Sequence, residues 1–211
     1  MLSNRWGWII MELPALFTVP FLFFMNDTGT NNIVLVFVAM WIFHYFHRTL
    51  IFPFRIKTKN KKIPWIIVIF GMFFNLINGY FIGIWLTTQS DTYSISWLET
   101  PCMWVGISLF ITGILINLSS DYRLLRLRKP GETGYKIPFG GFFNWVSCPN
   151  HFGEIIEWIG FAIMTWSPAG FAFAIWTAIN LIPRSLDHHR WYHLNFPDYP
   201  QNRKAVIPFL L

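Results

Sequence analysis

Six apolar segments follow one another along this chain, and they limit the folds that are open to it. They cover residues 6–25, 33–52, 64–87, 102–120, 152–166 and 168–183. A helix needs about 20 mostly apolar residues to cross a bilayer, so the first four reach or approach this length and the last two are short. Of the 211 residues, 54% are hydrophobic and only 12% are charged, which is typical of a multi-span membrane protein. The sequence therefore predicts an all-α, polytopic membrane helix bundle with six spans.

The basic residues support the count of six spans, because with six spans they all fall on one side of the membrane. The segments between spans one and two, three and four, and five and six contain no Lys or Arg. The other loops, the span ends and the tail carry all sixteen: Arg5, Arg48, Arg55, Lys57, Lys59, Lys61, Lys62, Arg123, Arg126, Arg128, Lys129, Lys136, Arg184, Arg190, Arg203 and Lys204. Lys and Arg gather on the cytoplasmic side, so both termini are predicted to face the cytoplasm. The net charge of +6 thus reflects topology and gives no reason to expect nucleic acid as a partner.

Polar residues interrupt the apolar pattern in the middle of the chain and again in its tail. They recur at steps of four and seven, which places them on one face of a helix. The three resulting stripes are Asn117, Asp121 and Arg128; Asn150 and Glu154; and Arg184, His188 and Tyr192. Such residues are costly in hydrocarbon, so each stripe needs either a ligand or a neighbouring helix to bond. We see no internal repeat, and we expect residues 1–211 to form a single membrane-embedded domain.

The chemistry of the stripes suits a nucleotide. Amides and carboxylates bond ribose hydroxyls and amide groups, and arginine forks bind phosphate through two N–H groups. The Gly140–Gly141 pair lets a ligand come close to the backbone. Neither GxGxxG nor GxxxxGK[ST] is present, so neither a Rossmann fold nor a P-loop is expected. The alternative interpretation is a solvated basic face that meets anionic lipid.

Glu12 and Tyr45 are polar residues inside the first and second apolar segments. A buried carboxyl group near a tyrosine can hold the phenol as a hydrogen-bond donor. A phenol held in this way can polarise a ketone and stabilise the enolate that forms from it. The alternative for Glu12 is a structural hydrogen bond to a neighbouring helix.

Histidines and cysteines could suggest a metal site or a disulfide. The chain has six histidines and two cysteines, and the histidines occur as His44-x2-His47, His188-His189, His151 and His193. We expect no metal, because the spacing fits no established site well. Cys102 and Cys148 fall on opposite predicted sides of the membrane, so we expect no disulfide between them.

Longer motifs make this sequence similar to one known family. They are NLSSDYRLLRLRKPGETGYKIPFGGFFNWVSCPNHFGEIIEWIGFA from Asn117, RSLDHHRWYHLNFPDYPQNRKAVIPFLL from Arg184, ELP at Glu12–Pro14 and HYFHRT at His44–Thr49. In their order along the chain they resemble the steroid 5α-reductase family, most strongly over residues 113–211. We expect a bacterial-type member of that family.

The resemblance implies an integral-membrane, NADPH-dependent reductase that acts on a 3-oxo-Δ4-steroid. It assigns cofactor contacts to Asn117, Asp121, Arg128, Tyr135, Asn150, Glu154, Arg184, His188 and Tyr192. It assigns the hold on the steroid carbonyl to Glu12 and Tyr45, and it places Trp8 and Trp158 near the steroid or the nicotinamide. In this picture the cofactor site faces the cytoplasm and the steroid, or a similar enone lipid, enters from the bilayer.

The sequence departs from the family pattern in two places. Members usually have seven spans, with one before the ELP motif, whereas eleven residues precede Glu12 here. Either the protein works with six spans or the first span is missing. The family also has an arginine near the cofactor where this chain has lysines, and either Lys61 or Lys62 is expected to replace it.

Two other functions are alternative interpretations of this sequence. A membrane methyltransferase of the isoprenylcysteine type has a similar bundle, but its cofactor, S-adenosylmethionine, has no phosphates for the arginines to bind. A non-enzymatic lipid-binding or scaffolding protein gives no reason for both Glu12 and Tyr45 to lie inside the membrane. The sequence therefore favours the reductase.

Overall fold

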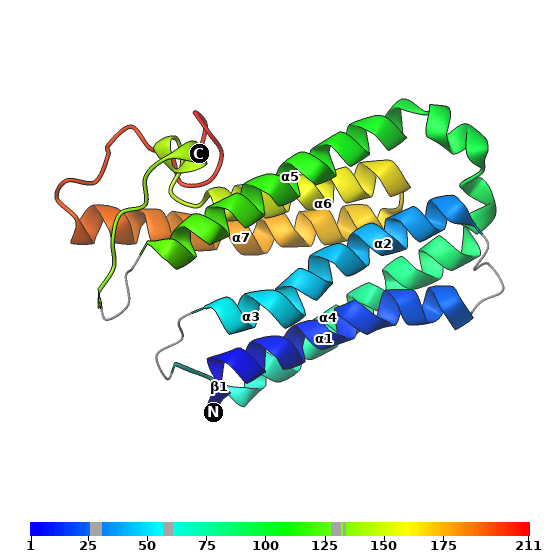
Figure 1. Cartoon of the computed structure of the whole chain (residues 1–211), viewed down its shortest axis with the longest axis horizontal. Coiled ribbons are helices and arrows are strands. Elements are labelled where there is room, and N and C mark those ends of the chain that lie inside the picture. The colour runs from blue at the N-terminus through cyan, green and yellow to red at the C-terminus, as the bar shows by residue number, and fades with distance from the viewer. Residues whose placement is uncertain (26–30, 57–60, 128–131, 133) are drawn as a thin grey trace. The chain divides into compact units, whose positions relative to one another are not determined.

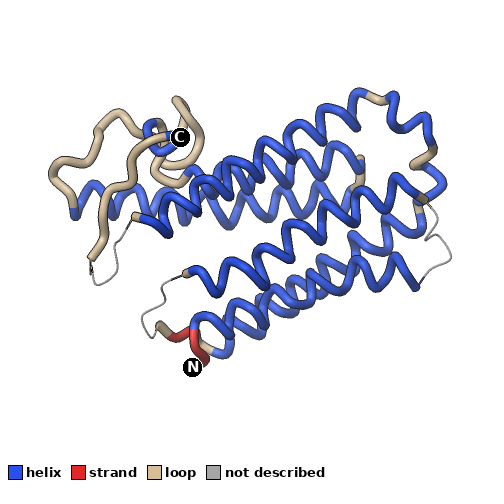
Figure 2. Tube along the Cα trace, in the orientation of Figure 1, coloured by secondary structure: helices blue, strands red, loops and turns tan. Residues whose placement is uncertain are grey.

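Helices form almost all of the regular structure in the computed structural model, which describes residues 1–25, 31–56, 61–127, 132 and 134–211 (Figure 1, Figure 2). They are α1 (Asn4–Met25), α2 (Asn32–Phe46), α3 (Phe52–Arg55), α4 (Trp65–Thr88), α5 (Pro101–Arg126), α6 (Pro149–Thr165) and α7 (Pro168–Asn195). The shorter elements are β1 (Leu2–Ser3), β2 (Lys62–Ile63), a π-helical turn (His47–Ile51) and three 3₁₀ turns (Ser90–Thr92, Ile95–Glu99 and Gly141–Asn144). Each of the six apolar segments lies in a helix, which confirms the all-α prediction.

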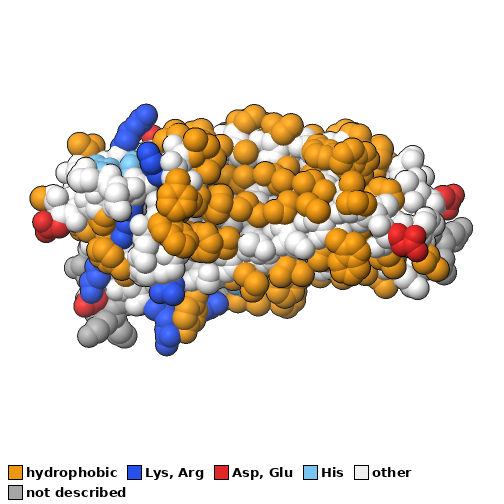
Figure 3. Space-filling model, turned by 90° about the horizontal axis from the view of Figure 1, so that it is seen from above, with side chains coloured by type: hydrophobic (Ala, Val, Ile, Leu, Met, Phe, Trp, Pro, Cys, Tyr) orange, Lys and Arg blue, Asp and Glu red, His pale blue; other side chains and the backbone are white. Residues whose placement is uncertain are grey.

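Four helical stretches within the described residues are long and apolar enough to cross a membrane. They are α1, the stretch Asn32–Arg55, α4 and α5. Helix α6 has only 17 residues, and neither it nor α7 belongs to this set. Hydrophobic side chains cover the middle of the face shown in Figure 3, and Lys and Arg side chains gather toward one end. This distribution fits an integral membrane protein, and the count of six spans stays a prediction.

The predicted topology can be tested with two exposed positions. In a Cys102→Ser background, Ser96→Cys lies in the loop without basic residues and Lys62→Cys lies in a basic segment. We expect an impermeant thiol reagent to label Ser96→Cys in intact cells and Lys62→Cys only after lysis. Labelling of Lys62→Cys from outside would contradict the predicted orientation.

The contacts divide the chain into two compact units, Met1–Met103 and Trp104–Leu211. The expectation of a single domain over residues 1–211 therefore stays a prediction, and the units are described separately below. In the first unit, α1 and α4 run side by side and in parallel. A Cβ added at Gly71 would lie 2.8 Å from the Met11 sulfur, and one at Gly83 would lie 2.7 Å from Leu22 Cδ1. These glycines allow the two helices to approach closely.

The π-helical turn follows directly after α2, which carries Tyr45. Phe52 donates its backbone N–H to the carbonyl of His47, five residues back, and Pro53 has no N–H with which to continue the regular pattern. Helix α2 is tied to α1 by the Trp41 indole N–H, which donates to the Ala15 carbonyl at 2.7 Å. The two polar residues predicted for substrate chemistry, Glu12 and Tyr45, thus belong to helices that pack together.

In the second unit, glycines bring the backbones of α5 and α6 into contact. A Cβ added at Gly153 would lie 2.5 Å from the Asn117 nitrogen and 2.6 Å from the Gly113 oxygen. A Cβ added at Gly106 would lie 2.5 Å from the Met164 nitrogen, so the two helices run antiparallel. This contact places Asn117 of the first polar stripe next to α6, which carries the second.

A methyl group at this contact is expected to be costly. In Gly153→Ala the new atom meets backbone that cannot move aside, so we expect a loss of stability of about 1–3 kcal/mol or more. The control is Gly83→Ala, where the nearest atom is the end of a flexible leucine side chain. Thermal unfolding in detergent measures both, and equal melting of Gly153→Ala and the parent protein would contradict the close contact.

The C-terminal tail is fastened to the start of α6. Ser147 donates its backbone N–H to the Lys204 carbonyl at 2.8 Å, and Cys148 donates to Ala205 at 3.0 Å. Val206 then lies fully buried against Ile155 of α6 and Leu181 of α7. The tail therefore belongs to the same packed unit as the polar stripes.

Candidate active site

The first two polar stripes are joined by hydrogen bonds between α5 and α6. The Asn117 side-chain amide donates to the Asn150 carbonyl at 3.0 Å and to Glu154 Oε2 at 3.4 Å. The Asn150 amide donates to Asp121 Oδ1 at 3.1 Å. Asn117 and Asp121 are buried. We call these four residues the polar ladder, and the structure brings all of them together.

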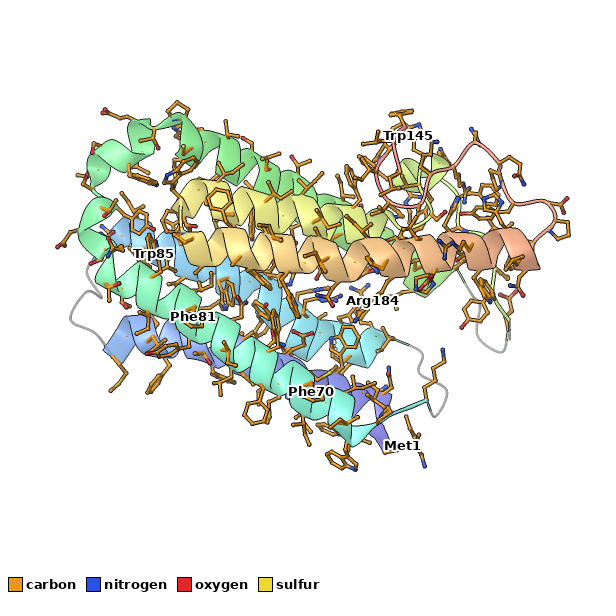
Figure 4. All side chains as sticks on the ribbon, turned by 180° about the vertical axis from the view of Figure 1, so that it is seen from behind. Met1, Phe70, Phe81, Trp85, Trp145 and Arg184 are labelled. Carbon is orange, nitrogen blue, oxygen red and sulfur yellow. The ribbon has the colours of Figure 1, made fainter. Side chains whose placement is uncertain are left out.

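The third stripe lies on α7, which stays helical as far as Asn195. Arg184, labelled in Figure 4, and His188 are exposed, whereas Tyr192 is half-buried. The ring of His188 lies 6.2 Å from that of His151 on α6. The third stripe therefore stands close to the second.

Tyr192 stacks on Tyr199 of the tail, with ring centroids 5.0 Å apart and planes 10° from parallel. The pKa of Tyr192 is raised to about 12. The main cause is burial, and the second is the neighbouring Tyr199. Its phenol therefore stays protonated near neutral pH and can donate a hydrogen bond.

Two further predicted cofactor residues follow α5 in the sequence. Arg128 falls outside the described residues. Tyr135 is exposed, and its ring lies 4.7 Å from that of Trp191.

Bare backbone lies beneath an arginine at Gly140 and Gly141. Both glycines have positive φ, 85° and 56°. A Cβ added at Gly140 would lie 2.9 Å from Arg123 Nη1. The positive φ favours glycine at both positions, and the Arg123 guanidinium lies against their backbone.

Glu12 and Tyr45 lie in the first unit, on α1 and α2. Tyr45 is buried, and its ring lies 4.7 Å from that of Trp41. Asn75 of α4 donates its side-chain amide to the Met11 carbonyl at 2.7 Å and to Glu12 Oε2 at 3.3 Å. Glu12 is thus oriented by a buried amide from a third helix.

The two tryptophans expected near the substrate lie in different units. Arg48 covers the ring of Trp8 at 5.0 Å, and the Trp8 indole N–H has no hydrogen-bond partner among the described residues. Trp158 is buried among aromatic rings, with Phe173 4.6 Å and Phe161 5.7 Å away. The structure places Trp8 in the same unit as Glu12 and Tyr45, and Trp158 in the same unit as the polar ladder.

Several polar residues near these sites escaped the sequence analysis. Asn75 stands inside an apolar span and could have been found by the same argument as Glu12. Ser147, Ser185 and Tyr199 are small or aromatic residues with no distinctive pattern, although Ser147 and Ser185 each precede a histidine by four positions. That four-residue spacing between serine and histidine was the one feature of the sequence that could have pointed to them.

Cys102 and Cys148 are both free in the structure, and their placement on opposite sides of the membrane stays a prediction. Within the described residues, no group of three or more His, Cys, Asp or Glu side chains is placed to hold a metal ion.

Comparison with known proteins gives a consistent answer. The family profile described as 3-oxo-5-alpha-steroid 4-dehydrogenase matches residues 61–211. The 3-oxo-5-alpha-steroid 4-dehydrogenase 1 of Mus musculus is 46% identical over 210 residues, which cover 98% of this chain and 81% of the mouse protein. The steroid 5-alpha-reductase DET2 of Arabidopsis thaliana is 42% identical over 211 residues, which cover 97% of this chain and 80% of the plant protein.

Proposed function

The chain belongs to the 3-oxo-5-alpha-steroid 4-dehydrogenase family, and we propose that it uses NADPH to reduce the C4–C5 double bond of a 3-oxo-Δ4-steroid or a similar enone lipid. The observation that carries the cofactor half of this proposal is the polar ladder. Its two amides and two carboxylates, drawn from α5 and α6, lie within hydrogen-bond distance of one another. Amides and carboxylates of this kind form the donor and acceptor set that ribose hydroxyls and a carboxamide need.

The residues around the ladder fit the remaining parts of NADPH. Arg184 and Arg128 would bind its phosphates, and the Arg123 guanidinium lies beside the backbone of Gly140 and Gly141. His188, Tyr192 and Tyr135 supply further polar groups and rings on the same unit. In this proposal the cofactor site faces the cytoplasm, where the basic residues gather.

We assign the binding of the substrate carbonyl to Tyr45 and Glu12. NADPH, when bound, supplies the hydride that C5 of the enone accepts. Negative charge then develops on the C3 oxygen, and the Tyr45 phenol donates a hydrogen bond to it. Glu12 holds the phenol in that orientation, and Asn75 holds Glu12 at 3.3 Å. Solvent or a group not yet assigned delivers the proton to C4.

Apolar side chains exclude water from this chemistry. Tyr45 packs against Trp41 in the first unit, and Trp158 packs against Phe161 and Phe173 in the second. An enolate and its phenol donor interact more strongly without competing water. The steroid is proposed to arrive from the bilayer, where such a substrate dissolves.

Purified protein in lipid tests the proposal. We expect NADPH oxidation that depends on an added 3-oxo-Δ4-steroid, and no binding of S-adenosylmethionine. Family membership favours the reductase over the methyltransferase, and binding of S-adenosylmethionine without enone reduction would reverse that order.

A further inference from the structure

Two reciprocal serine–histidine hydrogen bonds join the start of α6 to α7. Ser147 Oγ lies 2.6 Å from His189 Nδ1, and His151 Nδ1 lies 2.8 Å from Ser185 Oγ. Each side therefore contributes one serine and one histidine, four residues apart. Because the two helices run antiparallel, a step of four residues along α6 matches a step of four back along α7. The two bonds thus fix the register between these helices.

Ser147 has no bonding capacity left over. Its hydroxyl lies 2.7 Å from the Tyr199 hydroxyl and 3.2 Å from the Lys204 carbonyl, in addition to His189. A serine hydroxyl has one proton and two acceptor positions, and a carbonyl can only accept. The three bonds coexist only if Ser147 donates to Lys204 and accepts from Tyr199 and from His189 Nδ1–H. Ser147 is 4% exposed, so loss of its oxygen would leave two buried donors unpaired.

The second bond follows the same logic. Ser185 is fully buried and donates its proton to the Leu181 carbonyl at 2.7 Å. When its proton goes to Leu181, Ser185 accepts from His151 Nδ1–H. In this arrangement each histidine is held by a serine on the facing element.

These bonds stand directly beside the third polar stripe. On α7, Ser185 follows Arg184 and His189 follows His188, so each pair of neighbours differs by about 100° around the helix. Ser185 and His189, which bond residues at the start of α6, therefore fix the rotation of α7 and with it the direction in which Arg184 and His188 point. Ser147 is also linked to Tyr192 through Tyr199. The Tyr199 hydroxyl is hydrogen-bonded to Ser147, and the Tyr199 ring stacks on that of Tyr192 with centroids 5.0 Å apart.

We propose that Ser147 is a positioning residue for the cofactor site. It holds His189 and Tyr199 at once and through them sets the placement of His188 and Tyr192, while the bond between His151 and Ser185 supports Arg184 in the same way. This inference rests on the proposed function, since it assumes that the third stripe contacts NADPH. It concerns a residue that touches the stripe only through its neighbours.

Direct binding of NADPH to the full chain in lipid nanodiscs tests this role. We expect Ser147→Ala to raise the Kd for NADPH about tenfold, at the lower end of the losses that follow when a hydrogen bond that orients a metal ligand is removed. The matched control is Ser167→Ala. Ser167 is also a buried serine of this helix pair, but it caps the opposite end of α7 by accepting from Gly170 N–H at 2.8 Å. We expect both variants to melt at lower temperature and only Ser147→Ala to bind NADPH more weakly.

Tyr199→Phe keeps the stacked ring and removes one donor, so it provides a second measurement if Ser147→Ala does not fold. We expect a smaller rise of the Kd in the same direction. Unchanged NADPH binding in Ser147→Ala, or in Tyr199→Phe when that variant decides, would overturn the inference. An equal loss of binding in Ser167→Ala would also overturn it, since the effect would then follow from stability alone. Failure of the parent protein to bind NADPH would instead refute the proposed function.

Discussion

Tyr45→Phe is expected to lower kcat for enone reduction by about 10²–10³, the usual effect of removing one donor to a developing oxyanion. The substitution removes one hydroxyl and keeps the ring, so the packing of Tyr45 against Trp41 should survive. The Kd for NADPH should stay near the parental value, because the residues of the three polar stripes, to which the cofactor is assigned, are not on the helix that carries Tyr45. Steady-state kinetics and a binding assay on the same preparation measure both.

Glu12→Gln provides the companion test of the same chemistry. It keeps the shape of the side chain and removes its charge, so it should weaken turnover and steroid binding together. Because Glu12 and Tyr45 are proposed to act as a unit, the double variant should be little worse than the worse single variant. Parental rates of enone reduction in Tyr45→Phe would rule out the proposed mechanism.

Arg184→Ala is expected to raise the Kd for NADPH at least tenfold. A charge-assisted hydrogen bond contributes about 1.5–3 kcal/mol, which corresponds to this factor or more. Arg128→Ala should behave similarly, because both arginines are assigned to the phosphates. The loss should be smaller for NADH if either arginine binds the 2′-phosphate, and titration with both cofactors measures the difference.

Arg190→Ala is the matched control for this experiment. Arg190 lies on the same helix, is exposed, and forms a 3.6 Å ion pair with Asp187. Exposed pairs of this kind contribute little, so we expect Arg190→Ala to bind NADPH like the parent. Equal turnover with NADH and NADPH in the parent protein would show that no arginine recognises the 2′-phosphate.

The sequence predicted the helices well, because an apolar run of sufficient length has few other stable forms. All six segments lie in helices, and α4 differs from its predicted range by only one residue at each end. The last apolar segment was predicted to end at residue 183, and helix α7 continues beyond that residue to Asn195. The polar stripe at Arg184, His188 and Tyr192 already had the spacing of that continuation.

The polar ladder could be predicted as two faces, but its bonds could not. Spacing along one helix shows which residues share a face, and it does not show which helix lies opposite. That pairing depends on the contact of Gly113 and Gly153, whose backbones meet across α5 and α6. Ser147 and Tyr199 were missed for the same reason, since their 2.7 Å bond joins residues 52 positions apart.

We propose that this protein reduces the C4–C5 double bond of a 3-oxo-Δ4-steroid with hydride from NADPH. The most direct measurement uses purified protein in lipid, a 3-oxo-Δ4-steroid and NADPH that carries deuterium at the transferred position, followed by mass spectrometry and NMR of the product. The account predicts a saturated 5α-steroid with one deuterium at C5. No reduced steroid, or a reduced steroid without deuterium at C5, would contradict it.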